Sequence, residues 1–376
     1  MRVEKFVEQI QRLGISTLAG VPDSALKGFC DYINGEGGKE FKHYVPANEG
    51  AAVGIAIGHF LATGRPACVY MQNSGLGNIV NPITSLANEE VYGIPMLLVI
   101  GWRGEPGTKD EPQHKYMGKV TEEILKVLDI PYSIMDADTS ENKADIIFQQ
   151  AKETLNKKKQ YAIIVKRDSF EVAVKGKYEN EYILGREQAI EAIIKRLSPS
   201  DVVVSTTGKI SREVYEQSDA IWGHHKQCFL TVGGMGHSGM IALGIAKELA
   251  DKRVYCIEGD GAVFMHMGEL AFLAKQNPQN MIHICLNNDA HESVGGMPTG
   301  VGGMDFYQTA KACGYDYVAC VDSLEALETE LESAMQVKGI SFIEVKVKMG
   351  SRDNLGRPKE SAKENRESFM KYILEG

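Results

Sequence analysis

Short runs of apolar residues recur along the whole chain, and a segment with helical character follows most of them. Clear examples are the runs IPMLLVIGW (94–102), YAIIVK (161–166), DVVVST (201–206) and MIHICLN (281–287). Runs made almost entirely of Val, Ile and Leu are typical of strands buried on both faces, which occurs when helices cover both sides of a parallel sheet. The pattern therefore predicts an α/β protein built on parallel sheets.

The alternation of strands and helices is interrupted once, in the charged and polar stretch 166–186. A chain of 376 residues is longer than one ordinary hydrophobic core supports. We therefore predict two doubly wound domains, residues 1–170 and 187–376, joined by a linker at 171–186. In such sheets ligands bind at the carboxyl ends of the strands, so candidate site residues are sought there.

The composition excludes several classes of protein. With 41 Lys and Arg against 50 Asp and Glu, the net charge is −9, which argues against a general nucleic-acid binder. The seven cysteines contain no CxxC pair, so we expect small buried thiols in a reducing compartment. The N-terminus lacks the apolar stretch of a signal peptide, and no run approaches the roughly 18 apolar residues of a membrane span. We expect a cytoplasmic protein without a membrane segment.

A single carboxylate, Asp260, lies between Gly259 and Gly261 at the end of the apolar run 253–257. After Gly261 come 25 residues, and Asn287 and Asn288 follow at the end of the next apolar run. Taken alone, Asp260 is equally explained as a turn residue and the asparagines as a helix cap. In a parallel sheet, however, both sites emerge at the same edge. Carboxylate, amide and main-chain oxygens suit Mg²⁺, so the predicted ligands are Asp260, Asn288 and the carbonyl of Ala290.

A glycine-rich segment, TVGGMGHSGMIALGIA (231–246), precedes this pair of motifs. Its glycines between positions 233 and 239 would let backbone N–H groups and the start of a helix approach a diphosphate closely. The sequence thus places an anion-binding loop beside the predicted Mg²⁺ ligands.

The GDG and NN motifs at this interval resemble those of thiamine diphosphate-dependent enzymes. The resemblance covers nearly the whole chain and implies thiamine diphosphate and Mg²⁺ as cofactors. It also implies a pyrimidine-binding domain first and a diphosphate-binding domain second, without the middle domain of larger relatives. The cofactor-binding residues that it implies are Glu49, Ser74, Gly75, Gly233, Gly234, Met235, Asp260, Gly261, Ala262 and Asn288.

Glu49 lies where a strand ends and a helix begins, in YVPANEGAAVGIAIGHFLATG (44–64). The helix dipole favours a glutamate at this position whatever the function. The small residues that follow indicate close packing. In the thiamine enzymes that this stretch resembles, an acid at this place bonds the aminopyrimidine of the cofactor and assists its deprotonation, which requires a partly desolvated carboxyl group.

The compact two-domain form resembles the phosphonopyruvate and sulfopyruvate decarboxylases. Three stretches favour the former, AGVPDSALKGF (19–29), STTGKISREVYE (205–216) and GSRDNLGRPKES (350–361). The implied reaction converts 3-phosphonopyruvate to phosphonoacetaldehyde and CO₂, a step of phosphonate (2-aminoethylphosphonate) biosynthesis. A sulfopyruvate decarboxylase and a catalytically silent subunit on the same fold stay open as alternatives. A P-loop nucleotide-binding protein is disfavoured, because no GxxxxGK[ST] motif occurs.

The resemblance also implies catalytic side chains beside Glu49, namely Asp23, His114 and His291. Two departures leave the proton donor open: Gln113 replaces the first member of a histidine pair, and Val294 stands where pyruvate decarboxylases have a glutamate. Cations suited to a phosphonate, each equally explained as a surface charge, are Arg352, Arg357, Lys209 and Arg212. In this family the cofactor spans two subunits, so we expect a homo-oligomer with active sites at its interfaces and a small 2-keto acid phosphonate as substrate.

Overall fold

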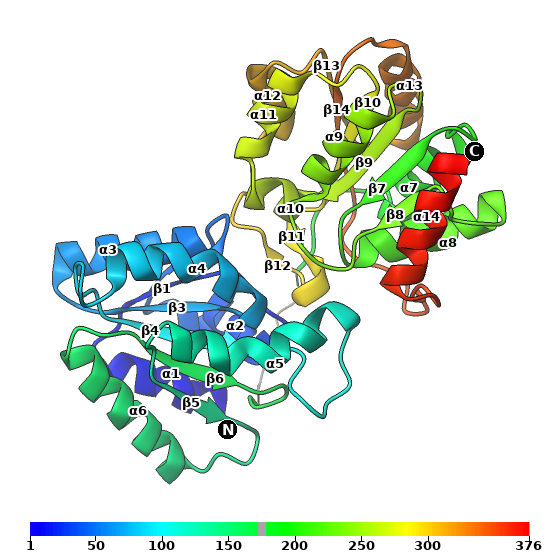
Figure 1. The fold of residues 1–376 in the computed structure, drawn as a ribbon. Coiled ribbons are helices and arrows are strands. Elements are labelled where there is room, and N and C mark those ends of the chain that lie inside the picture. Colours follow the sequence, from blue (N-terminus) through cyan, green and yellow to red (C-terminus); the bar gives the residue numbers. More distant parts are fainter. Residues whose placement is uncertain (172–177, 376) are drawn as a thin grey trace. The chain divides into compact units, whose positions relative to one another are not determined.

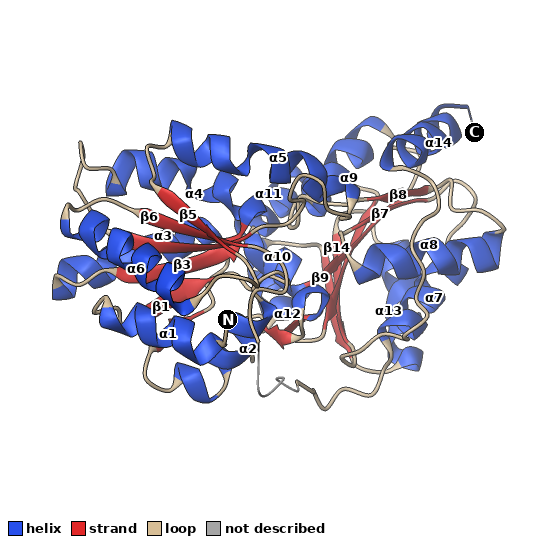
Figure 2. Cartoon of the chain, turned by 90° about the horizontal axis from the view of Figure 1, so that it is seen from below, coloured by secondary structure: helices blue, strands red, loops and turns tan. Residues whose placement is uncertain are grey.

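The computed structural model describes residues 1–171 and 178–375, which form two compact units (Figure 1). The first unit comprises Met1–Lys177 and Val294–Gly300, and the second comprises Tyr178–Ser293 and Val301–Gly376. The predicted α/β class is confirmed, because each unit contains a parallel sheet with helices on both of its faces (Figure 2).

The first unit holds a six-stranded sheet in the order β2-β1-β3-β4-β6-β5, and every pairing in it is parallel. Strands β3 and β4 are buried almost throughout because they lie at its centre. The elements are α1 (Val3–Arg12), β1 (Thr17–Gly20), α2 (Lys27–Asn34), η1 (Glu36–Gly38), β2 (Lys42–Tyr44), α3 (Glu49–Thr63), β3 (Ala67–Gln72), η2 (Asn73–Gly75), α4 (Leu76–Pro82), η3 (Ile83–Ala87), β4 (Met96–Gly101), α5 (Pro112–Val127), β5 (Tyr132–Met135), α6 (Glu141–Asn156) and β6 (Tyr161–Val165).

The second unit holds a six-stranded parallel sheet in the order β13-β14-β10-β9-β7-β8. The elements of the rest of the chain are α7 (Arg186–Lys195), β7 (Val202–Ser205), α8 (Lys209–Trp222), β8 (Cys228–Leu230), α9 (Ser238–Glu248), β9 (Val254–Gly259), α10 (Asp260–Met265), α11 (Gly268–Gln276), β10 (Met281–Asn287), β11 (Ala290–His291), η4 (Glu292–Val294), β12 (Met297–Pro298), α12 (Phe306–Cys313), β13 (Tyr317–Val321), α13 (Leu324–Gln336), β14 (Ser341–Lys346) and α14 (Ala362–Glu375).

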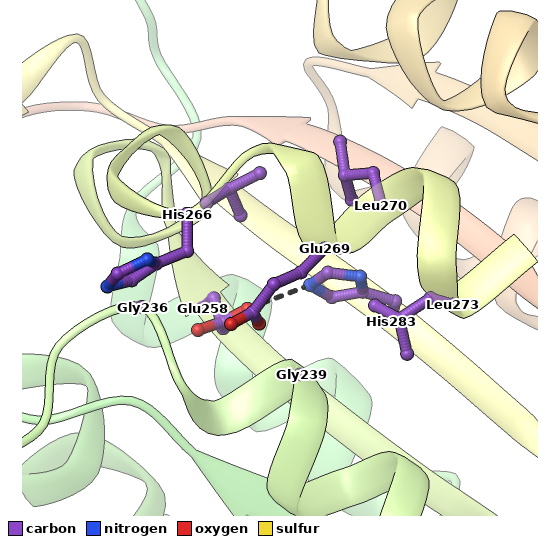
Figure 3. A pocket seen from close by; sticks show the side chains of 9 residues that line it. Gly236, Gly239, Glu258, His266, Glu269, Leu270, Leu273 and His283 are labelled. Atoms are coloured by element: carbon purple, nitrogen blue, oxygen red, sulfur yellow. Dashed lines mark hydrogen bonds and ion pairs between the residues drawn. The ribbon is translucent and has the colours of Figure 1, made fainter.

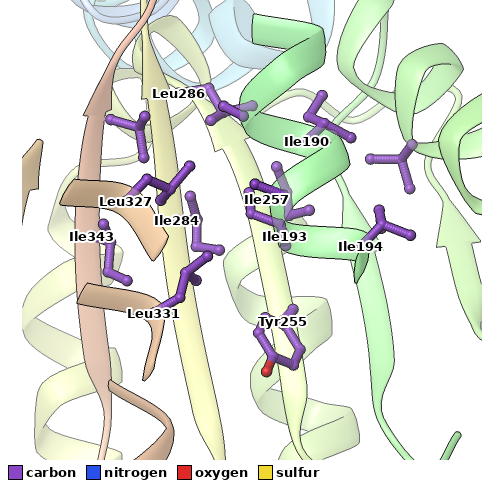
Figure 4. Packing of buried hydrophobic residues seen from close by; sticks show 14 of the residues in the cluster. Ile190, Ile193, Ile194, Tyr255, Ile257, Ile284, Leu286, Leu327, Leu331 and Ile343 are labelled. Atoms are coloured by element: carbon purple, nitrogen blue, oxygen red, sulfur yellow. The ribbon is translucent and has the colours of Figure 1, made fainter. Parts of the chain in front are cut away.

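One face of the second sheet packs against helices α7 and α13 through branched aliphatic side chains (Figure 4). Tyr255 and Ile257 of β9 and Ile284 of β10 point to this side. Because side chains alternate along a strand, Cys256 and Glu258 of β9 point to the opposite face. Helices α9 and α11 cover that face.

The division of the chain differs from the predicted one in two respects. Residues 294–300 belong to the first unit, although in the sequence they follow β9 and β10 of the second unit. Within them, Gly300 has φ +74° and touches the Val45 carbonyl so closely that no Cβ would fit. Of the predicted linker, residues 172–177 lie outside the described part, whereas Asn180 belongs to the second unit and donates to the carbonyl oxygens of Asn288 and Val347, both at 3.0 Å.

The cysteines are all free thiols. Five are buried as expected, Cys313 is half-buried and Cys320 is exposed, so the expectation of burial was wrong for Cys320. Among the described residues, no helix is both long and apolar enough to cross a bilayer.

Candidate active site

Glu49 is the first residue of α3, and the side chain of Asn48 caps that helix by accepting from the N–H of Ala51 at 3.0 Å. The Glu49 side chain is buried, with 5% of its surface exposed. Asn78 Nδ2 donates to Glu49 Oε2 at 2.6 Å, and a Cβ on Gly75 would lie 2.5 Å from Glu49 Oε1. A glycine is therefore required at position 75 if the carboxylate is to hold this position.

Asp23 follows β1 and is fully buried. Its carboxylate accepts from Gln72 Nε2 at 2.6 Å and from the N–H of Ala25 at 2.9 Å. Burial raises the pKa of Asp23 above its ordinary value, and the hydrogen bond from Gln72 and the charge of Arg103 offset this only in part. Burial thus favours the protonated form of Asp23 more than it does for an exposed aspartate. Ser74 Oγ donates to Gln72 Oε1 at 2.7 Å, so the side chain of Gln72 links Ser74 to Asp23.

Arg103, which the sequence analysis did not single out, lies just after β4 and orders this edge of the first sheet. Its guanidinium donates to both oxygens of Asp110, at 2.8 and 2.5 Å, and to Ser24 Oγ at 2.6 Å. The neighbouring His114 is in the first turn of α5, where burial and the charge of Arg103 lower its pKa to about 4. His114 is therefore a neutral imidazole at pH 7.

Asp260 and Asn288 lie at the carboxyl ends of neighbouring strands in the second unit. Asp260 begins α10 directly after β9, and Asn288 follows β10, whose Leu286 pairs with Gly259. Both side chains are buried. The predicted juxtaposition at one sheet edge follows directly from this parallel register.

The Asn288 side chain is held in one orientation. Its Nδ2 donates to Glu292 Oε2 at 2.8 Å, and its Oδ1 accepts from the N–H of Ala290 at 3.1 Å. An amide oxygen has two lone pairs, so Oδ1 keeps one for a metal ion. Asn287, in contrast, turns its Nδ2 to Glu344 at 2.8 Å and has a structural role.

The glycine-rich segment forms a tight loop that ends at the start of α9. Gly234 and Gly236 have φ of +66° and +86°, which L side chains rarely adopt. A Cβ on Gly236 would lie 2.6 Å from His266 Cδ2 and 3.0 Å from the Ala262 carbonyl. Met235 between them is half-buried. An exposed loop of backbone N–H groups before a helix fits a diphosphate, and the oxygen ligands at 260 and 288 fit its magnesium ion.

Comparison with known proteins identifies the family to which the chain belongs. The N-terminal TPP binding domain of thiamine pyrophosphate enzymes matches residues 3–124, and their C-terminal TPP binding domain matches residues 216–345. The chain is 33% identical to the phosphonopyruvate decarboxylase of Streptomyces hygroscopicus over 96% of this chain and 92% of that protein. It belongs to the thiamine diphosphate-dependent 2-keto acid decarboxylases.

Two further relatives place the chain within this decarboxylase family. The phosphonopyruvate decarboxylase of Streptomyces viridochromogenes is 32% identical over 96% of this chain and 92% of that protein. The sulfopyruvate decarboxylase of Methanosarcina acetivorans is 26% identical over 93% of this chain and 92% of that protein. The chain is therefore a carboxy-lyase that uses thiamine diphosphate and acts on a small keto acid.

In this decarboxylase a buried ion-pair network supports the loop that carries Asn288. Arg186 donates to both oxygens of Glu213 at 2.7 Å and to Glu292 Oε2 at 2.5 Å. Lys209 Nζ reaches the other oxygen, Glu292 Oε1, at 2.9 Å. Burial acts to raise the pKa of Glu292, but the charge and hydrogen bonds of Arg186 and Lys209 hold it below its ordinary value. Glu292 is thus a carboxylate that fixes the amide of Asn288.

The predicted substrate cations all lie in the second unit, but they differ in their ion-pair partners. Arg352 is paired with Glu187 at 3.0 Å and also with Glu216, so its charge is compensated by two carboxylates, which argues against a role in binding phosphonate. Lys209 shares Glu292 with Arg186 and is partly exposed. Arg212 lies in the first turn of α8, and Arg357 lies between β14 and α14.

His291, another predicted catalytic residue, lies in the short strand β11 and is partly buried. Burial lowers its pKa to about 4, so it is neutral at pH 7.

Arg103 and Arg186 were missed by the sequence analysis. The signal that would have found Arg103 is its place two residues after the end of a fully buried strand, in the segment GWRGE.

Proposed function

We propose that this protein decarboxylates 3-phosphonopyruvate to phosphonoacetaldehyde and CO₂, as a step of phosphonate biosynthesis. The observation that carries this proposal is the near full-length identity of 33% to a phosphonopyruvate decarboxylase, compared with 26% to a sulfopyruvate decarboxylase. The cofactors in the proposal are thiamine diphosphate and Mg²⁺.

The proposed metal ligands are Asp260, Asn288 and the Ala290 carbonyl. The arrangement of β9 and β10 supports this set because it brings the first two to adjacent strand ends. Gly233, Gly234 and Met235, with Gly261 and Ala262, form the proposed diphosphate and thiazolium contacts. Thiamine diphosphate, when bound, supplies the carbon nucleophile and accepts the electron pair left by CO₂.

Side chains of the first unit are proposed to donate and accept the protons of the reaction. We assign the exchange of a proton with the cofactor's pyrimidine to Glu49, whose carboxylate is buried and oriented by Asn78. Asp23 is the proposed proton donor to the product, because it is fully buried and burial raises its pKa above the ordinary value. His114 and His291 are neutral, so they are proposed to donate or accept hydrogen bonds and not to pair as cations with the substrate.

Phosphonate recognition requires positive charge in the pocket, since a buried dianion without a partner is very costly. Of the four predicted cations we favour Lys209, which is 31% exposed and starts α8 close to Asn288 through their shared partner Glu292. Arg212 and Arg357 stay second candidates, and Arg352 ranks behind them because of its two carboxylate partners.

We also propose a homo-oligomer in which the first unit of one subunit and the second unit of another complete each active site. The first unit supports this proposal with large exposed apolar side chains on α3, on η3 and in the turn that follows η3. They include Leu61, Leu86, Val91 and Tyr92. A cytoplasmic location stays a prediction.

The substrate assignment predicts a ranking of keto acids. With thiamine diphosphate and Mg²⁺ present, we expect phosphonopyruvate to be turned over at least about tenfold faster than sulfopyruvate or pyruvate at equal concentrations. The reason is that a phosphonate group can carry two negative charges, whereas a sulfonate group carries one and pyruvate has neither group. CO₂ release and aldehyde formation would be followed together. Faster turnover of sulfopyruvate would move the protein to the sulfopyruvate decarboxylases, and no turnover of any keto acid would favour a silent subunit.

The metal assignment predicts that Asp260→Ala weakens Mg²⁺-dependent binding of thiamine diphosphate roughly 100-fold or more, since a charged ligand is removed. Isothermal titration calorimetry at several Mg²⁺ concentrations measures this. The matched control is Asp251→Ala, an exposed aspartate that precedes β9 at the opposite end of the strand. Unchanged cofactor affinity in Asp260→Ala would refute the magnesium site.

A further inference from the structure

Three potential metal ligands converge on the buried face of the second sheet that α9 and α11 cover. Cys256 and Glu258 are two residues apart on β9, so their side chains point to the same side, and His283 of β10 pairs with Cys256 in the strand register. All three are buried. The proposed reaction uses none of them.

Their ligand atoms are already close together. The Cys256 sulfur, a Glu258 carboxylate oxygen and a His283 ring nitrogen all lie within 4.8 Å of one another. In a tetrahedral zinc site with its usual bond lengths, such atoms are about 3.4–3.6 Å apart. Small side-chain shifts would therefore bring this set to zinc-binding distances.

A small cavity borders the cluster and has room for about one water molecule or ion. Figure 3 shows Glu258, Glu269 and His283 with their polar ends turned toward one another beside Gly239. A Cβ on Gly239 would lie 3.5 Å from Glu258 Oε2 and 3.9 Å from Glu269 Oε2, so both carboxylates border the same space. Glu258 is buried, whereas Glu269 is 24% exposed and its Oε1 lies 3.5 Å from His237 Nδ1; a cation beside Glu258 would balance the charge of the buried carboxylate.

A hydrogen-bonded chain explains only part of the cluster. Tyr315 Oη lies 3.2 Å from His283 Nδ1, and His283 Nε2 lies 3.0 Å from Glu258 Oε2. This chain gives partners to both ring nitrogens and to one carboxylate oxygen. Glu258 Oε1 is buried and has no hydrogen-bond partner among the described residues. A buried carboxylate oxygen without a partner is costly and calls for a ligand.

We propose that Cys256, Glu258 and His283 bind one Zn²⁺ ion at the base of the glycine-rich loop, with Glu269 or a water as the fourth ligand. The mixed thiolate, imidazole and carboxylate set suits zinc and not magnesium. On binding, the Cys256 thiol transfers its proton to solvent, and the charges of the thiolate and the Glu258 carboxylate balance the ion. Tyr315 would keep its contact with Nδ1 and orient the imidazole.

Such an ion would have a structural effect on the diphosphate loop. It would join β9 and β10 close to Gly239, the second residue of α9. The site is distinct from the proposed magnesium site at Asp260 and is independent of the proposed reaction.

The test is a titration of the full-length, chelator-treated protein with Co²⁺ and then Zn²⁺, without thiamine diphosphate. We expect one equivalent of Co²⁺ to give a thiolate-to-cobalt charge-transfer band and tetrahedral d–d bands, and one equivalent of Zn²⁺ to displace it. Cys256→Ser, a near-isosteric change, should abolish the charge-transfer band, and His283→Gln should weaken Zn²⁺ binding at least about tenfold.

Two controls make the result specific. Cys320→Ser removes an exposed thiol and should leave the spectrum unchanged. Asp260→Ala should also leave it unchanged, which separates this site from the magnesium site. The absence of a stoichiometric charge-transfer band in the unaltered protein, or a band that persists in Cys256→Ser, would show that Glu258 and His283 form only a hydrogen-bonded chain.

Discussion

The Glu49→Gln variant is expected to bind thiamine diphosphate nearly as well as the unaltered protein and to lose about 10²–10⁴-fold of its turnover. Glutamine has the same shape, and its amide oxygen can still accept from Asn78 Nδ2, so the start of α3 and the contact with Gly75 are kept. The variant lacks the exchangeable proton of the Glu49 carboxyl group. Turnover of phosphonopyruvate and the calorimetric affinity for the cofactor would be measured on the same preparation.

Glu141→Gln is the matched control for this variant. Glu141 is also the first residue of a helix, α6, but its side chain is exposed. If the loss came from weaker interaction with a helix dipole, both variants would show it. A fully active Glu49→Gln would remove Glu49 from the mechanism, and a parallel loss of cofactor binding would make it a binding residue.

The Arg186→Met variant is expected to destabilise the second unit by about 3–5 kcal/mol, because it leaves the carboxylates of Glu213 and Glu292 buried without their main cation. Arg186 is only 4% exposed and makes three charged hydrogen bonds to these two residues. Methionine fills a similar volume, so the effect reports the charge and not a cavity. Denaturant unfolding followed by circular dichroism measures the change.

The same variant should also weaken Mg²⁺-dependent cofactor binding, since Glu292 would no longer hold the Asn288 amide in place. Arg196→Met is the control. Arg196 follows the same helix, α7, but its ion pairs with Glu328 and Glu332 are partly exposed and should contribute no more than about 1 kcal/mol. An equal, small loss of stability in both variants would mean that the buried network contributes little.

Much of the fold could be predicted from the sequence because the central strands are buried on both faces. The runs at β4, β6, β7 and β10 are nearly continuous aliphatic segments, which is typical of parallel strands that helices cover on both faces. The placement of Asp260 and Asn288 at one edge then follows from parallel pairing alone. Hydrophobic pattern and order along the chain were sufficient for these features.

The ion-pair partners could not be predicted in the same way. Arg186 is 27 residues from Glu213 and 106 residues from Glu292 in the sequence. Periodicity shows which side chains face a core, but a charged residue on such a face has several potential partners. Which one it meets depends on the helix packing, so only the structure identifies Glu292 as the residue that holds Asn288.

The segment 294–300 has a consequence for any attempt to divide this protein. Because the chain leaves the second unit, supplies these residues to the first and returns, the units are joined by more than one covalent crossing. A gene split between residues 171 and 178 would therefore not yield two self-sufficient chains. The second chain would have to donate 294–300, including the Gly300 that fits against Val45, to complete its partner.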